Sequence, residues 1–309
     1  MSSTTAIPAA APLAAFSESL SAVVEHVGAG TLAVPGRHGR GLASAVVWRS
    51  GVVVTAAHVF RRTPAAISMV GADGKVVEAT LAGIDSPTDL AVFRVSAEAG
   101  AVASLGDPAG IKAGSLAIAV GRSMQGDLTA SYGIVNRTSG PWETWLGGQL
   151  DRLIRLDGGL YDGLSGGPVA DAGGHVIGIA SAALSRSYGI VVPVGTVDRV
   201  VDALLSGGQV GRAFLGIGAK PVPVRGEGAE RTGLLITDLV SGGPAETAGV
   251  LIGDILVTVD GKPASSLHDL RIALASKIGQ SVAATVHRGG VPTELALTVG
   301  QWPNEKRRC

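Results

Sequence analysis

Ser165 lies among glycines, in the stretch 163–168 that reads Gly-Leu-Ser-Gly-Gly-Pro. A serine hydroxyl is a weak nucleophile at its ordinary pKa, so it needs a base and a trap for the developing anion. Glycines on both sides let the backbone turn tightly, which exposes the hydroxyl and aims amide N–H groups at an oxyanion. The sequence therefore predicts an oxyanion turn at Gly163, Leu164 and Ser165, with the amides of Gly163 and Ser165 as donors. Alone, the pattern Gly-x-Ser-x-Gly also fits the nucleophile elbow of α/β-hydrolases or a plain turn.

His58 follows an apolar strand and has small neighbours, as a general base beside a cleft would have. Asp89 immediately precedes another apolar strand, where a carboxylate can be buried against an imidazole and fix its tautomer. Asp85, in a turn that contains proline, is the alternative carboxylate, and we interpret it as a turn residue. A single histidine is more often a core residue than a catalytic one. We give that interpretation to the remaining five: His26, His38, His175, His268 and His287.

The chain order of these residues separates two classes of hydrolase. They occur as His58, Asp89, Ser165, whereas an α/β-hydrolase places its histidine after the serine and alternates strands with helices. The order and the many strands favour a mainly β fold, a double β-barrel with the site between its halves. An α/β-hydrolase acting on small esters is the disfavoured alternative.

The pattern of apolar residues predicts the elements that position this site. Residues 1–15 are rich in Ser, Thr, Ala and Pro and predict a flexible arm, and residues 17–27 have helical spacing up to Gly28. Short β-branched runs separated by glycine turns then predict strands. These runs are 41–48, 52–55, 76–84, 89–95, 116–120, 128–136, 150–156, 175–181 and 188–194. A helix over 196–206 closes a first domain, expected to span 16–208.

A second, smaller domain is expected over 211–301, followed by a tail over 302–309. Its pattern predicts strands near 213–220, 234–239, 254–259, 281–287 and 293–299. Pro244 opens a one-turn helix, and Ser266 is the predicted N-cap of a longer one. The unit is expected to be a compact α+β module.

The composition excludes several functions. Lys+Arg and Asp+Glu number 25 each, so no net charge attracts nucleic acid. The single cysteine, Cys309, leaves no intrachain disulfide and, without a His-Glu-x-x-His motif, no readable metal site. We therefore expect neither metal nor cofactor. No apolar run is long enough for a transmembrane segment, and no export signal is recognisable, so the sequence favours a cytoplasmic protein.

The three motifs together resemble the signatures of the HtrA/DegP branch of trypsin-like serine proteases. They are residues 53–59, 88–92 and 163–168. The second domain resembles that family's PDZ domain in residues 244–250 and 253–256, and in a carboxylate-binding loop of Phe214, Leu215, Gly216 and Ile217. The likeness covers roughly residues 16–301.

The resemblance implies a chymotrypsin-like double β-barrel followed by an α+β PDZ domain. It implies a serine endopeptidase with the triad His58, Asp89 and Ser165, which cleaves unfolded or exposed polypeptides in protein quality control. It also implies peptide C-termini as PDZ ligands, a homotrimer, and the periplasm or cell envelope as the alternative location.

An S1 pocket follows from the same resemblance. Gly159, six residues before the serine, is expected at its base, with Leu160, Ile179 and Ala180 as apolar walls. Trypsin-like specificity for Lys or Arg requires a carboxylate at this base, so the sequence favours small to medium aliphatic P1 residues.

Two departures from the family pattern matter. Leu164 stands where relatives have Asn, which supports an alternative hypothesis, a catalytically latent peptide-binding or chaperone module. The segment between Val34 and Gly41 is short and lacks a long regulatory loop, which argues against assembly into a large cage.

Overall fold

The computed structural model describes residues 10–35, 42–60, 64–207, 213–224, 231–274 and 277–301. The chain divides into two compact units, Met1–Val210 and Gly211–Cys309. His38, Cys309, residues 1–9 and the tail 302–309 lie outside the described residues. Among the helices that are described, none is both long enough and apolar enough to cross a membrane.

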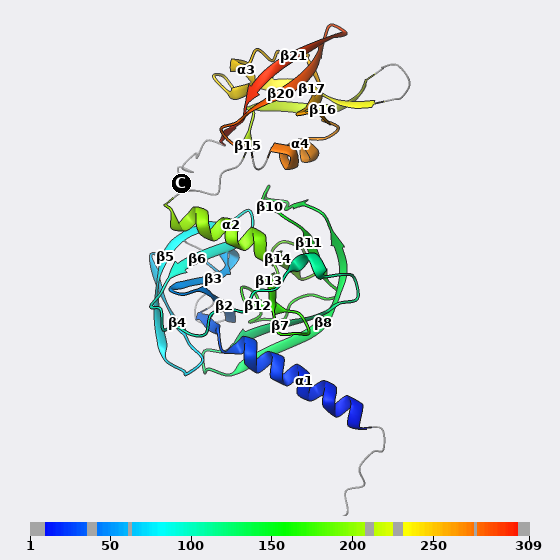
Figure 1. Cartoon of the computed structure of the whole chain (residues 1–309). Helices are drawn as coiled ribbons and strands as arrows, with labels where there is room; N and C mark the ends of the chain where they lie inside the picture. The colour runs from blue at the N-terminus through cyan, green and yellow to red at the C-terminus, as the bar shows by residue number, and fades with distance from the viewer. Residues whose placement is uncertain are drawn as a thin grey trace, which may run out of the picture. The chain divides into compact units, whose positions relative to one another are not determined.

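The first unit contains two closed six-stranded barrels (Figure 1). The first barrel has the strand order β1-β2-β3-β6-β5-β4 and the second β11-β14-β13-β12-β7-β8. The first consists of β1 (Thr31–Pro35), β2 (Leu42–Arg49), β3 (Val52–Ala56), β4 (Ala66–Val70), β5 (Val76–Asp85) and β6 (Leu90–Arg94). The second consists of β7 (Leu116–Arg122), β8 (Leu128–Ser139), β11 (Leu153–Leu156), β12 (Pro168–Ala170), β13 (Val176–Ser181) and β14 (Ile190–Pro193). The predicted mainly β, double-barrel fold is confirmed.

Three apolar clusters follow from the alternation of side chains along these strands. One fills the first barrel around Phe93 and one fills the second around Ile154. The third contains residues of both barrels, such as Val54 and Ile118, together with the buried face of helix α2 (Val194–Leu205). Because several strands of each barrel contribute side chains both to a barrel interior and to this shared layer, the two barrels are packed together.

Helix α2 is fastened to the first barrel by polar contacts. The indole Nε1 of Trp48 donates to Asp198 Oδ1 at 2.9 Å. Arg49 pairs with Asp198 and Asp202, each at 2.5 Å. The helix also packs against β13 and β14 of the second barrel, so it bridges the barrels.

Helix α1 (Ala10–Gly28) begins earlier than the sequence pattern predicts. The expectation of a flexible arm over 1–15 is wrong for residues 10–15. Alanine has the highest helix propensity, and Pro12 lies in the first turn, where its missing N–H removes no helical hydrogen bond. The pattern also missed β1, β4 and β12. A small hairpin of β9 (Trp142–Glu143) and β10 (Gln149–Leu150) precedes β11.

The second unit is built on one mainly antiparallel sheet with the order β16-β17-β18-β20-β21, in which β19 also pairs with β18. Its strands are β16 (Ile217–Val224), β17 (Arg231–Leu239), β18 (Ile255–Val259), β19 (Lys262–Pro263), β20 (Ser281–Arg288) and β21 (Val291–Thr298). β15 (Ala213–Phe214) pairs with β22 (Gly300–Gln301), and the helices are α3 (Pro244–Thr247) and α4 (Leu267–Leu274). Strand β16 stands at an edge of this sheet.

Candidate active site

His58 donates two hydrogen bonds to the carboxylate of Asp89. His58 lies in the short 3₁₀ turn Ala57–Val59 that ends β3, and Asp89 precedes β6. Asp89 Oδ2 lies 2.8 Å from His58 Nδ1, and Asp89 Oδ1 accepts the His58 backbone N–H at 2.8 Å. Since a carboxylate only accepts, Nδ1 carries the proton and Nε2 is the basic nitrogen. The Asp89 side chain is 4% exposed and that of His58 33%, so the carboxylate is buried and the imidazole reaches solvent.

The turn before β6 orients Asp89. Thr88 donates its N–H and its hydroxyl to Asp85 Oδ2, at 3.3 and 2.6 Å. Asp85 is therefore used inside the turn, as its interpretation as a turn residue expected. Asp89 itself has φ 60, a left-handed conformation in which aspartate is one of the tolerated residues.

Ser181, at the end of β13, is a functional residue that the sequence analysis missed. Its hydroxyl donates to Asp89 Oδ2 at 2.6 Å and is fully buried with it. The carboxylate thus accepts from the His58 backbone, the His58 ring and Ser181, which compensates for its removal from water. No local motif marks Ser181, because the contact spans 92 residues.

Ser165 occupies a turn that lies directly against the first barrel. Its carbonyl accepts the Ser44 N–H of β2 at 3.0 Å. A Cβ on Gly166 would lie 2.3 Å from Thr55 Oγ1 and 2.4 Å from Ser44 O, and Gly166 has φ +82. A Cβ on Gly167 would lie 2.2 Å from Val120 O. These glycines are therefore required by the close approach of backbones from both barrels as well as by the turn itself.

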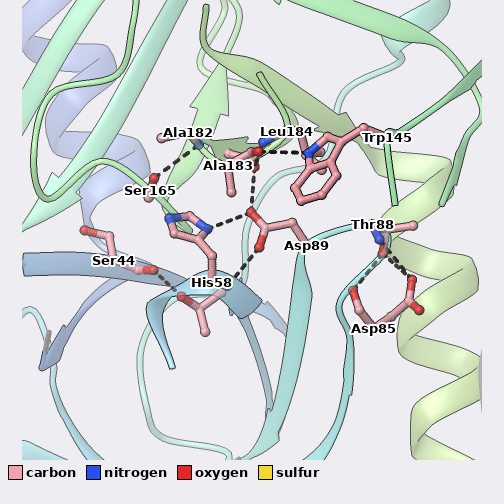
Figure 2. A network of polar contacts seen from close by, with 12 residues as sticks. Ser44, His58, Asp85, Thr88, Asp89, Trp145, Ser165, Ala182, Ala183 and Leu184 are labelled. Carbon is pink, nitrogen blue, oxygen red and sulfur yellow. Dashed lines mark hydrogen bonds and ion pairs between the residues drawn. The ribbon is translucent and has the colours of Figure 1, made fainter. Parts of the chain in front are cut away.

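The three polar side chains converge between the barrels. In Figure 2 the His58 imidazole lies between the Asp89 carboxylate and Ser165. Ser165 Oγ accepts the Ala182 N–H at 3.3 Å. Trp145, a further residue that the sequence analysis did not single out, donates its indole N–H to Ala183 O at 3.3 Å. The segment that follows Ser181 therefore borders Ser165, the predicted nucleophile.

The predicted oxyanion turn is held by the packing of Leu164. This side chain is 2% exposed and belongs to the apolar cluster inside the second barrel, with Ile177 and Ala180. Its N–H donates to Tyr161 O at 3.2 Å and its carbonyl accepts from Gly167 N–H at 3.0 Å. The Leu164 amide is thus used inside the turn, which leaves the amides of Gly163 and Ser165 as the candidate oxyanion donors.

The predicted S1 residues do not all face one space. Gly159 is exposed, and a Cβ there would meet nothing within 4 Å. Leu160 and Ala180 share the cluster that contains Leu164. Ile179 belongs instead to the layer between the barrels. Because neighbouring residues on a strand point to opposite faces, Ile179 and Ala180 cannot both line one pocket. The two S1 assignments are therefore alternatives, and each stays a prediction.

The predicted carboxylate loop of the second unit lies at the start of the edge strand β16. Phe214 is in β15, Leu215 is buried, and Gly216 has φ +73. The Leu215 carbonyl accepts Ala245 N–H at 2.9 Å, and the Gly216 carbonyl accepts Val240 N–H at 2.8 Å. In a trans peptide the N–H points opposite to the carbonyl. The amides of Gly216 and Ile217 are therefore turned away from these internal partners.

Within the described residues, no three His, Cys, Asp or Glu side chains gather as a group that could hold a metal ion.

Comparison with protein families gives two matches. Residues 43–179 match the trypsin-like peptidase domain and residues 214–299 match the PDZ domain. A DegP-like periplasmic serine endoprotease of Chlamydia trachomatis is 33% identical over 270 residues, which are 84% of this chain and 54% of that protein. A protein of the same description from Brucella suis is 33% identical over 278 residues, with 84% and 52% covered. The chain thus spans about half the length of these curated relatives.

Solved structures give a likeness over nearly the whole chain. The HtrA-type protease AlgW with a decapeptide has a TM-score of 0.77 and 25% identity, with 92% of this chain and 99% of that chain covered. The same protease with a tripeptide has a TM-score of 0.75 and 28% identity, with 92% and 97% covered.

The crowding at Gly166 generates a stability prediction. Gly166→Ala should lower the free energy of unfolding of the full chain by about 3–5 kcal/mol, because a methyl meets backbone atoms and the backbone is left-handed there. Chemical denaturation measures this. The control is Gly110→Ala, where a Cβ meets nothing within 4 Å. Equal stability of the two variants would contradict the described packing of the turn.

Proposed function

The chain belongs to the HtrA/DegP type of trypsin-like serine proteases, and on that premise we propose that it is an active serine endopeptidase that cleaves unfolded or exposed polypeptide segments. The observation that carries this proposal is the contact of His58 Nδ1 with the buried Asp89 carboxylate at 2.8 Å. That contact presents Nε2 as a base on the side where Ser165 lies (Figure 2).

The reaction follows from these groups as acyl transfer. Ser165 Oγ attacks the scissile carbonyl carbon while His58 Nε2 takes its proton. The amides of Gly163 and Ser165 bind the oxyanion of the tetrahedral intermediate. His58 then gives the proton to the leaving amine, and the C–N bond breaks to leave an ester on Ser165. Water attacks this ester by the same route and regenerates the hydroxyl.

The latent alternative loses its support in the packing of Leu164. An unanchored leucine in an oxyanion turn would favour a disordered site, but this side chain is buried in the second barrel. The proposed enzyme needs no cofactor, because the nucleophile, the base and the anion trap all come from the chain.

Substitution of the proposed triad tests the function. Ser165→Ala and His58→Ala should lower the turnover of a casein substrate by about 10⁴–10⁶-fold, and Asp89→Asn by about 10⁴-fold. Asp85→Asn, in the neighbouring turn, is the matched control and should retain turnover within about tenfold. Thermal unfolding confirms that each variant is folded. Retention of full turnover by Ser165→Ala would refute the proposal.

We also propose a small to medium aliphatic P1 preference, such as Val, Ala or Ile, because Gly159 offers no carboxylate and Leu160 and Ala180 are apolar. A Lys or Arg side chain inserted against the apolar walls would lack a partner, at a cost of several kcal/mol. Mass spectrometry of products from a peptide library measures the preference. Dominant cleavage after Lys or Arg would contradict it.

For the PDZ unit we propose capture of a peptide's terminal carboxylate by the amides of Leu215, Gly216 and Ile217. The peptide would add as a strand beside the edge strand β16. The outward direction of two of these amides and the left-handed Gly216 support this binding mode.

A pair of peptides tests carboxylate capture. In the full-length Ser165→Ala variant, a peptide that ends in Val or Phe should bind at least about tenfold more tightly than its C-terminal amide. The amide lacks charge-assisted hydrogen bonds worth roughly 1.5–3 kcal/mol. Calorimetry measures both affinities. Equal affinity would show that this unit does not read a terminal carboxylate.

A homotrimer and a place in the cell envelope complete the proposal. Residues 11–19 of α1 are exposed, and Leu13 and Phe16 present apolar surface for a contact between copies. For the compartment, the relatives described as periplasmic favour the cell envelope, and nothing supports the cytoplasmic expectation.

A further inference from the structure

Ser44, in the first barrel, contacts the turn of residues 163–167 that carries Ser165. It lies in β2 and is fully buried. Its N–H donates to Ser165 O at 3.0 Å, and its carbonyl accepts the Thr55 hydroxyl at 2.6 Å. Its hydroxyl lies 2.7 Å from Gly163 O and 2.9 Å from the Arg122 backbone nitrogen. One side chain therefore connects the oxyanion turn with the end of β7.

The direction of the Ser44 hydroxyl proton follows from its two partners. The Arg122 backbone N–H can only donate, so Ser44 Oγ accepts there. Its single proton is then directed at the Gly163 carbonyl, which can only accept. The arrangement holds the Gly163–Leu164 peptide from one side, while Tyr161 O binds the Leu164 N–H on the other. This peptide lies between the two peptides that carry the proposed oxyanion donors, Gly163 N–H and Ser165 N–H.

The hydrogen bond between Ser44 and Gly163 leaves no room for a side chain on the neighbouring Gly121. A Cβ on Gly121 would lie 2.9 Å from both Gly163 O and Ser44 Oγ. Gly163 has φ +94, so its backbone could take other conformations if its carbonyl were released. The hydrogen bond from Ser44, together with that of the Leu164 N–H to Tyr161 O, therefore restrains the orientation of a glycine peptide at the proposed oxyanion hole.

Arg122 connects this point to helix α1. Its guanidinium is buried, with the residue 4% exposed, and burial lowers its pKa. It donates to the carbonyls of Gly28, Thr31 and Gly126. The structure gives it no carboxylate partner among the described residues. The Gly28 carbonyl ends α1, where the helix dipole favours a cation. The same residue thus holds the end of α1 with its side chain and supports Ser44 with its backbone.

We propose that Ser44 is a positioning residue for the oxyanion hole. We further propose that Arg122 couples the position of the Ser44 hydroxyl to helix α1. This inference rests on the proposed function, because it assigns a role within that reaction. It provides a physical route by which contacts made by α1 reach the catalytic site. Neither residue touches the substrate in this account.

The test compares Ser44→Ala with Thr129→Val. Thr129 Oγ1 is buried with no hydrogen-bond partner among the described residues, so its removal is the matched control. Ser44→Ala should lower kcat/KM for a peptide substrate and the affinity for a peptide boronic acid by the same factor, roughly 10- to 100-fold. KM, and substrate binding measured in the Ser165→Ala background, should change less than about threefold. Thr129→Val should leave all four quantities within about twofold.

A purely structural role of Ser44 would not lower kcat/KM and boronic acid affinity while leaving KM and substrate binding nearly unchanged. If Ser44→Ala keeps the boronic acid affinity of Thr129→Val, the positioning role is refuted. Ser44→Cys, which has a similar shape and only a weak S–H donor, serves as the second variant in case Ser44→Ala unfolds at the assay temperature. It should lose affinity for the boronic acid in the same direction, and unchanged affinity would count equally against the proposal.

Arg122→Met tests the connection to α1. It keeps the backbone N–H that Ser44 accepts but removes the guanidinium, so boronic acid affinity should fall by a smaller factor than in Ser44→Ala. Affinity equal to that of the unmodified chain would refute the connection. The proposed function is judged separately, by hydrolysis in the unmodified chain. An inactive unmodified chain refutes the function, whereas an active one with an unaffected Ser44→Ala variant refutes only the positioning role.

Discussion

The contact between the turn that carries Ser165 and strand β2 is the constraint on which the rest of the site depends. Ser165 belongs to the second barrel, whereas His58 and Asp89 belong to the first, so the site exists only where the barrels meet. Hydrogen bonds from Ser44 to Ser165 O and Gly163 O fix that meeting. The approach is so close that Gly166 and Gly167 can bear no side chain. The shared apolar layer and helix α2 hold the barrels at this distance.

The buried carboxylate of Asp89 adds an electrostatic requirement to the interface between the two barrels. A buried carboxylate is costly unless its oxygens are occupied by donors. Here the donors come from His58 in the first barrel and Ser181 in the second. The requirement to satisfy one carboxylate therefore also brings the two barrels into register around the imidazole. The stability of the barrel interface and the proposed chemistry therefore depend on the same contacts of Asp89.

Residues with local signatures could be found from the sequence, and residues defined by distant contacts could not. His58, Asp89 and Ser165 stand at strand ends and glycine turns, which are visible in the pattern of neighbours. Ser181 and Ser44 are ordinary buried strand residues whose partners lie 92 and 119 positions away. Leu164 is unusual in the motif, but only the second barrel's core shows that its side chain is an anchor. Short strands such as β1 and β4 were missed because few residues carry their period.

Reaction of the full chain with a peptidyl phosphonate, followed by intact mass measurement and peptide mapping, tests the central claim most directly. The reagent requires a serine oxygen made nucleophilic by a neighbouring base and a formed oxyanion hole. The account predicts one adduct per chain, carried by Ser165, and none when His58 is replaced by alanine. Absence of an adduct from the unmodified chain, or its attachment to another serine, would contradict the account.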